Sequence, residues 1–103
     1  MVAKRLPDEL LAEVEKLRHV PGIVFADDTS GRVPRVAGTG IEVWEIISTY
    51  KAVGRSWSEL QAAFPWLTPS QIRAAIRYYE AFPEEVEAQL EEEQQLLNEY
   101  ETD

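Results

Sequence analysis

Apolar residues in the middle of the chain recur at the spacing of helix faces in two short runs, with the sequence FPWLT between them. Ser56 stands three residues before Glu59, and Thr68 stands three residues before Gln71. Both patterns are typical of a capping box, in which two side chains satisfy free backbone N–H groups at a helix start. The pattern therefore predicts two short helices joined by a tight turn, the outline of a helix-turn-helix. Their predicted buried residues are Leu60, Ala63 and Phe64, then Ile72, Ala75, Ile76 and Tyr79.

Two more segments carry an apolar face at helical spacing. The first begins after Pro7 and ends by His19, before a Pro-Gly pair. The second covers residues 41–53 and is ended by Gly54. The fold is therefore expected to be mainly α. The two apolar faces consist of Leu10, Leu11, Val14 and Leu17 in the first helix and Val43, Ile46, Ile47, Tyr50 and Val53 in the second.

Residues 22–37 have the pattern of a short β-hairpin, because two β-branched runs flank the turn sequence DDTSG. Pro34 has no N–H to donate, so its strand is expected at an edge or a bulge. A two-stranded hairpin alone is only marginally stable in water, and this one needs cover from a helix or from the same hairpin of another protomer. We therefore predict a homodimer in which hairpins or N-terminal helices cover one another.

The last segment, residues 83–103, begins with a proline followed by two glutamates, as helices often do. Val86, Leu90 and Leu97 form a narrow apolar seam along it and are the candidate partner-binding residues. Glutamates interrupt the seam, so the segment is expected to fray in isolation. Two arrangements are open: the segment orders against a partner, or it packs as a solvated helix on its own domain.

The net charge of −9 is divided unevenly along the chain. Residues 80–103 contain ten acidic residues and no basic one. Residues 32–79 contain six basic residues against three acidic ones, a net of +3. A bipolar chain of this kind suits a protein with two partners of opposite charge, or one whose tail regulates its middle.

The length of 103 residues allows one small domain with a single core. No run approaches the ~18 consecutive apolar residues that a membrane span needs, and no secretory signal opens the chain, so a cytoplasmic protein without membrane contact is expected. The domain, residues 1–103, is divided into the hairpin at 22–37, a three-helix helix-turn-helix core at 41–82, and an acidic C-terminal helix or tail at 83–103.

Catalytic and metal-binding chemistry finds little support in the composition. The chain has no cysteine and a single histidine, His19, which is expected at the surface end of a helix. Asp27 and Asp28 are interpreted as turn residues, because no third acid follows at the spacing of a metal loop. We therefore predict no enzyme, no cofactor and no metal site.

The second helix of the helix-turn-helix carries the candidate DNA-binding residues. With its apolar positions turned inward, four polar side chains are left outside, and glutamine and arginine have the geometry to bond adenine and guanine edges. An ordinary polar helix face is the alternative. Trp44, Trp57 and Trp66 are expected in the core rather than as a base-stacking surface. The four candidates are Ser70, Gln71, Arg73 and Arg77.

Four motifs match a known family at specific spacing. They are Gly38-Thr39-x-Ile41-x-Val43, Gly54-x-Ser56-x-x-Glu59-Leu60, Phe64-Pro65-x-Leu67-Thr68 and Gln71-Ile72-x-Ala74-Ala75-Ile76-x-Tyr78-Tyr79. With them, residues 35–79 resemble the bacterial and archaeal family of proteins of unknown function numbered 433. The resemblance implies a small helix-turn-helix protein of homeodomain-like fold, and many members are regarded as antitoxins encoded beside a PIN-like nuclease toxin. One position departs from the pattern, since an arginine commonly follows Gly-Thr and this chain has Gly40.

Two functions from different classes follow. The first is an antitoxin that binds operator DNA through the helix-turn-helix and neutralises a PIN-like nuclease toxin through its acidic C-terminal segment. In this case the acidic segment lies within reach of Arg73 and Arg77 if Pro83 lets the chain fold back, and it would then compete with DNA for them. The alternative is a dimeric protein-interaction or adaptor module that does not bind DNA.

Overall fold

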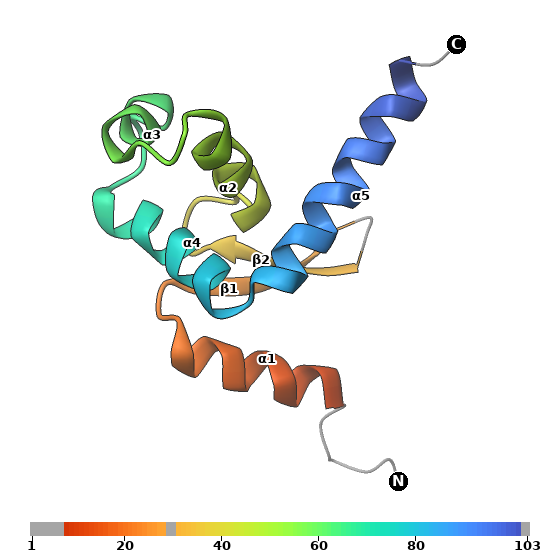
Figure 1. The fold of residues 1–103 in the computed structure, drawn as a ribbon. Helices are drawn as coiled ribbons and strands as arrows, with labels where there is room; N and C mark the ends of the chain where they lie inside the picture. Colours follow the sequence, from red (N-terminus) through yellow and green to blue (C-terminus); the bar gives the residue numbers. More distant parts are fainter. Residues whose placement is uncertain (1–7, 29–30, 102–103) are drawn as a thin grey trace, which may run out of the picture.

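The structure is a computed structural model that describes residues 8–28 and 31–101. Within these residues, five helices pack with a two-stranded hairpin (Figure 1). This mainly helical fold, with a hairpin and flanking helices, confirms the architecture that the sequence pattern predicts. The elements in chain order are α1 (Asp8–His19), β1 (Ile23–Asp28), β2 (Gly31–Val36), α2 (Val43–Ala52), α3 (Trp57–Ala63), α4 (Pro69–Ala81) and α5 (Pro83–Glu101).

The hairpin pairs β1 with β2 in antiparallel register, with Phe25 opposite Pro34. Both strands are edges of the two-stranded sheet, so Pro34 is tolerated there. Helices α1 and α4 pack on β1, and α2 and α4 pack on β2. The Phe25 ring meets the Tyr78 ring edge-on, with 6.1 Å between centroids. Helices of the same chain therefore cover the hairpin, which is one of the two arrangements expected from the sequence.

The two helix starts of the helix-turn-helix differ. At α4, Thr68 accepts from the Gln71 N–H at 3.1 Å, and the Gln71 side chain accepts from the Thr68 N–H at 2.9 Å. This is a complete capping box, as predicted. At α3, the Ser56 side chain accepts from the Glu59 N–H, but the Ser56 N–H donates to the carbonyl of Val53 instead. The capping box predicted at α3 is therefore only half formed.

The core lies where α2 and α4 cross the hairpin. Helix α2 packs against both α3 and α4, which with the turn between them form the helix-turn-helix. Tyr78 is fully buried, and Ala74 is nearly so, although neither belongs to the predicted face of α4. Ile76, which does belong to it, is only partly buried. The buried stripe of α4 is wider than predicted because α2 covers one side of the helix and the hairpin and α5 cover another.

The three tryptophans do not share the core position expected of them. Trp44 and Trp57 are partly buried and pack against the core cluster. Trp66 lies in the turn between α3 and α4 with 66% of its surface exposed, and it contacts the ring of Phe64 edge-on at 5.7 Å between centroids. The expectation was therefore wrong for Trp66, because the turn directs its side chain outward.

Helix α5 behaves differently in its two halves. Val86 is fully buried and Leu90 packs against the core from the first half. The second half projects away from the domain (Figure 1), and Leu96, Leu97 and Tyr100 are exposed over 46%, 55% and 86% of their surface. The segment thus packs on its own domain at its base only. No helix of the part of the chain described here is long and apolar enough to cross a membrane.

Candidate functional site

A surface that we call the α4 arginine face is formed by Ser70, Arg73 and Arg77. Their spacing of three and four residues places them on one side of α4, and all three side chains are exposed. The complete capping box and Pro69 fix the start of the helix immediately before them. The face is therefore presented by a rigid helix whose first turns are open to solvent.

Gln71 does not belong to this face. Its side-chain oxygen accepts from the Thr68 N–H, and the residue is only partly exposed. This hydrogen bond holds the helix start and points the amide back along the chain. Of the four residues predicted to bind DNA, the structure brings together three and assigns Gln71 to the cap.

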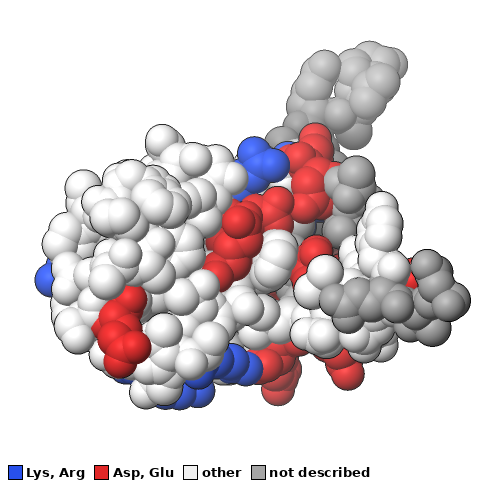
Figure 2. Space-filling view, turned by 90° about the horizontal axis from the view of Figure 1, so that it is seen from above, with Lys and Arg blue, Asp and Glu red and all other residues white. Residues whose placement is uncertain are grey.

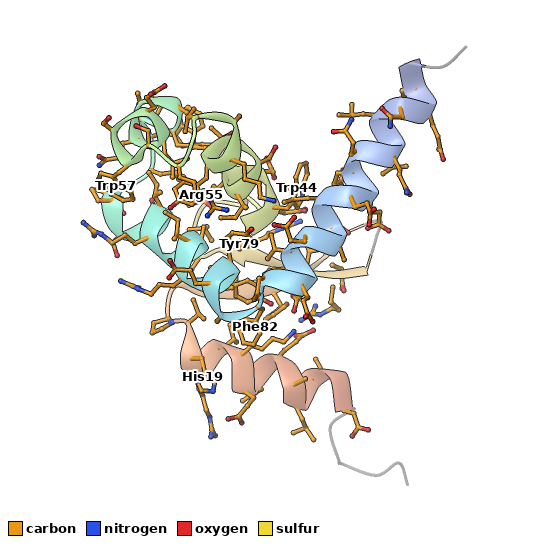
Figure 3. All side chains as sticks on the ribbon, in the orientation of Figure 1. His19, Trp44, Arg55, Trp57, Tyr79 and Phe82 are labelled. Carbon is orange, nitrogen blue, oxygen red and sulfur yellow. The ribbon has the colours of Figure 1, made fainter. Side chains whose placement is uncertain are left out.

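Three aromatic contacts orient two arginines at the helix-turn-helix. The guanidinium carbon of Arg73 lies 5.3 Å from the ring centre of Trp57, on α3. Arg55, in the turn between α2 and α3, lies 5.5 Å from the ring of Tyr50 and 6.0 Å from that of Tyr79 (Figure 3). Cation–π contacts hold a guanidinium in place without neutralising its charge. The positive charge therefore stays available to an anionic ligand.

The lysines and arginines that the structure describes fall into two groups. Among residues 8–28 and 31–101, no ion pair involves Arg18, Arg55, Arg73 or Arg77. The others are paired: Lys16 with Glu85, Arg32 with Glu13 and Asp27, Arg35 with Glu42, and Lys51 with Glu87. Of the four arginines that form no ion pair among the described residues, Arg73 and Arg77 lie on α4 and Arg55 lies just before α3.

Two glutamates, in addition to the apolar seam, hold the base of α5 to the rest of the domain through hydrogen bonds and ion pairs. Glu85 accepts from the hydroxyl of the buried Tyr78, and burial together with this carboxylate raises the pKa of Tyr78. Glu87 accepts from Lys51 and from the Tyr79 hydroxyl, and these hydrogen bonds lower the pKa of Glu87. These contacts tie α5 to α4 and α2.

A fold-back of the acidic segment onto the α4 arginine face does not occur. Phe82 ends α4, Pro83 begins α5 at once, and the new helix leaves across α2 and the hairpin (Figure 1). The carboxylates of its first turns contact Lys16, Lys51, Tyr78 and Tyr79. Arg73 and Arg77 are therefore left free of the acids that a fold-back would have brought to them.

The three candidate partner-binding residues of α5 do not form one surface. Val86 is fully buried in the protein's own core, and Leu90 is partly buried against it. Leu97 is exposed, and so are the nearby Leu96 and Tyr100. The start of the seam therefore packs within the domain, and its end is the part most exposed to a partner.

The described part of the chain contains no group of three or more His, Asp or Glu side chains placed to hold a metal ion. His19 lies exposed at the end of α1 (Figure 3), and Asp27 pairs with Arg32 across the hairpin. Neither residue is brought to a second group with which it could act chemically.

Comparison with known proteins adds a family and a related structure. No curated protein matches the chain. A crystal structure of a DUF433 member protein from Anabaena variabilis ATCC 29413 is similar to it, with 32% sequence identity, 82% of this chain and 85% of the other covered, and a TM-score of 0.55. The family model described as "Protein of unknown function (DUF433)" matches residues 23–79, so the match includes the hairpin that the sequence motifs left out. The chain belongs to the DUF433 family.

Proposed function

We propose that this protein is the antitoxin of a toxin–antitoxin pair. In this proposal the α4 arginine face binds operator DNA, and the exposed end of α5 binds and neutralises a PIN-like nuclease toxin. The observation that carries the proposal is the separation of charge in the fold: arginines without ion pairs surround the helix-turn-helix, while the acidic helix leaves on another side.

The α4 arginine face has the chemistry of a DNA contact. Arginine bonds guanine through two donors, and serine and the capped start of a helix suit phosphate oxygens. In helix-turn-helix proteins the second helix enters the major groove with its first turns. The exposed Trp66, in the turn just before α4, adds a flat apolar surface beside that entry point. We therefore add Trp66 to the residues proposed to contact DNA.

A net charge of +3 over residues 32–79 is small for a lone DNA-binding unit. Two copies on a two-fold site would double the number of phosphate contacts. Helix α1 exposes Leu11 and Val14 on one side, and β1 exposes Val24. These apolar residues support a homodimer formed through α1, and they are the surface that we assign to it.

The proposed toxin contact is the end of α5, where Leu96, Leu97 and Tyr100 are exposed among acidic residues. Apolar side chains supply contact area, and the surrounding carboxylates steer a basic partner toward it. Single exposed leucines are ordinary at a protein surface, but three exposed apolar residues within five positions at one helix end form a patch. This patch supports the second half of the proposal.

The DNA half is tested by a gel shift with DNA from upstream of the protein's own gene. The double variant Arg73→Ala, Arg77→Ala is expected to weaken binding at least tenfold, because each arginine–base contact is worth about 1–3 kcal/mol. The matched control, Arg32→Ala with Arg35→Ala, removes the same charge from the hairpin and should bind within about threefold of the wild type. Unchanged binding by the first variant would refute the assignment.

The toxin half is tested by co-expression with the product of the adjacent gene. A chain cut after Gln95 keeps Val86 and Leu90 in the core but loses the exposed patch. It should no longer co-purify with the nuclease or inhibit it. If co-purification persists at full strength, the end of α5 is not the docking surface.

The alternative, an adaptor module that does not bind DNA, is favoured by the same exposed apolar residues of α1 and α5. Protein binding without any DNA shift would support it. The gel shift therefore separates the two functions directly.

A further inference from the structure

A groove lies between α2 and the middle of α5, with a volume of about 520 Å³. One wall is a face of α2 and the other is a face of α5, because the lining residues on each helix are separated by one, three or four positions. The two helices diverge from the base of α5 toward its end (Figure 1). The lining residues are Trp44, Ser48, Lys51 and Ala52 on α2, and Leu90, Glu93, Gln94 and Leu97 on α5.

The floor of the groove is apolar. Trp44 and Leu90 pack partly against the core, and Leu97 extends the apolar surface along α5. Packed helices lie about 8–10 Å apart between their axes, so a third helix seated in this groove would contact both α2 and α5. A helical segment with one apolar side fits such a strip.

The rim of the groove is acidic. Glu93 lines it, and burial together with the nearby charges of Glu92, Asp28 and Glu45 raises the pKa of Glu93. Burial and the neighbouring Asp28 likewise raise the pKa of Glu42, whose side chain accepts from the Trp44 indole N–H. Figure 2 shows acidic side chains gathered across the middle of the molecule in the view from above. Carboxylates that raise one another's pKa are stabilised by an added positive charge.

Two cations lie near these carboxylates, and neither forms an ion pair with Glu93 among the described residues. Arg35 pairs with Glu42 at 4.0 Å. Lys51 donates to Glu87 and lies over the ring of Tyr79, 5.7 Å from its centre. Its charge is therefore directed to the base of α5, away from Glu93 and its neighbours. A second α5 in the groove would bring its eight acidic residues to an acidic rim, so charge disfavours it.

We propose that the groove between α2 and α5 binds a basic amphipathic helix of the partner protein, with its apolar side on Trp44, Leu90 and Leu97 and its basic side on the carboxylates of the rim. This inference deepens the toxin half of the proposed function and rests on it, since it states which chemistry of the partner the α5 surface recognises. The helix of the partner thus lies along α5 instead of meeting only its exposed end.

The first test uses a synthetic 15-residue peptide with leucines on one helical face and lysines elsewhere, and a second peptide with glutamate in place of every lysine. Titrated into the full-length protein at 0.15 M salt, the lysine peptide should bind at least about tenfold more tightly than the glutamate peptide. It should also shift the indole N–H resonance of Trp44. Failure of the lysine peptide to bind, or equal binding of both peptides, would overturn the proposal.

Paired variants of the full chain locate the binding. Glu93→Lys should weaken the lysine peptide about fivefold to tenfold, while Glu91→Lys makes the same charge change outside the groove and should have a smaller effect. Leu97→Ala should weaken it more than Leu96→Ala, because only Leu97 lines the groove. Equal effects within each pair would mean that the peptide binds the acidic helix without using the groove.

The same pairs, tested against the co-purified nuclease, separate this inference from the proposed function. In one outcome the cut after Gln95 abolishes nuclease binding, but each groove variant weakens nuclease binding only as much as its control does. The toxin contact then stands, and the groove does not hold the nuclease helix. If the cut has no effect, the toxin half of the proposed function fails. If Glu93→Lys and Leu97→Ala weaken nuclease binding more than their controls, both hold.

Discussion

The α4 arginine face and the base of α5 lie on helices that contact each other, yet the charged side chains are unpaired on the first and paired on the second. At the base of α5, carboxylates are matched to Lys16, Lys51 and two tyrosine hydroxyls. On α4, Arg73 and Arg77 face solvent, and Arg73 is held only by an aromatic ring. The ion pairs at the base of α5 stabilise the fold, whereas the unpaired charge of the α4 arginine face is free to bind a ligand.

The largest expected effect concerns the base of α5 as part of the core. Val86→Asp places an unpaired charge among fully buried side chains and should cost about 3–5 kcal/mol of unfolding free energy. The control, Leu97→Asp, adds the same charge at an exposed site of the same helix and should change stability by less than about 1 kcal/mol. Urea denaturation measures both. Similar losses for the two variants would contradict the division of α5 into a packed base and a free end.

The next prediction concerns the cap that holds the α4 arginine face. Thr68→Ala removes one half of the capping box and should cost about 1 kcal/mol, with a parallel loss of DNA affinity. Ser56→Ala should cost less, because the box at α3 is only half formed. Thermal unfolding compares the two variants. A larger loss for Ser56→Ala would show that α3, and not α4, is the helix whose start is fixed.

Local signals predicted most of the fold. Turn residues, capping patterns and apolar spacing gave the hairpin and all five helices, since each depends on neighbouring residues. The position of Tyr78 and the outward turn of Trp66 were not predicted, because they depend on which elements cover α4 and on the shape of one turn.

The direction of α5 could not be read from its sequence either. Lys16 and Glu85 are 69 positions apart, and Lys51 and Glu87 are 36 apart, so these pairs exist only once the helices have packed. The sequence showed that acids and arginines are present in separate segments. It did not show that the fold keeps them apart: the chain does not fold back at Pro83, so the condition for masking Arg73 and Arg77 is not met.

The smallest expected effect concerns the acidic rim. The pKa of Glu93 is higher in the folded protein than in the unfolded chain, where it is about 4.3. Glu93 therefore adds to stability at a pH below about 4.3, where it is protonated in both states. This contribution is lost as the pH rises through the folded-state pKa. Glu93→Gln should therefore be more stable than the wild type at pH 7, by less than about 0.5 kcal/mol, and equal to it near pH 3.5. Glu99→Gln, at the exposed end of α5, serves as the control in the same urea titrations. A stability gain that is independent of pH would contradict the crowding of carboxylates at the rim.

The central claim is that the fold separates a DNA-binding surface from a protein-binding one. The most direct test measures operator affinity at 0.15 M salt for three proteins: the wild type, the double variant Arg73→Ala, Arg77→Ala, and the chain cut after Gln95. At this salt concentration, screening removes most long-range effects of the acidic residues that the cut removes. We predict a loss of at least about tenfold for the arginine variant and a change of less than about threefold for the shortened chain. Tight binding by the arginine variant, or a large gain in affinity on shortening, would contradict the account.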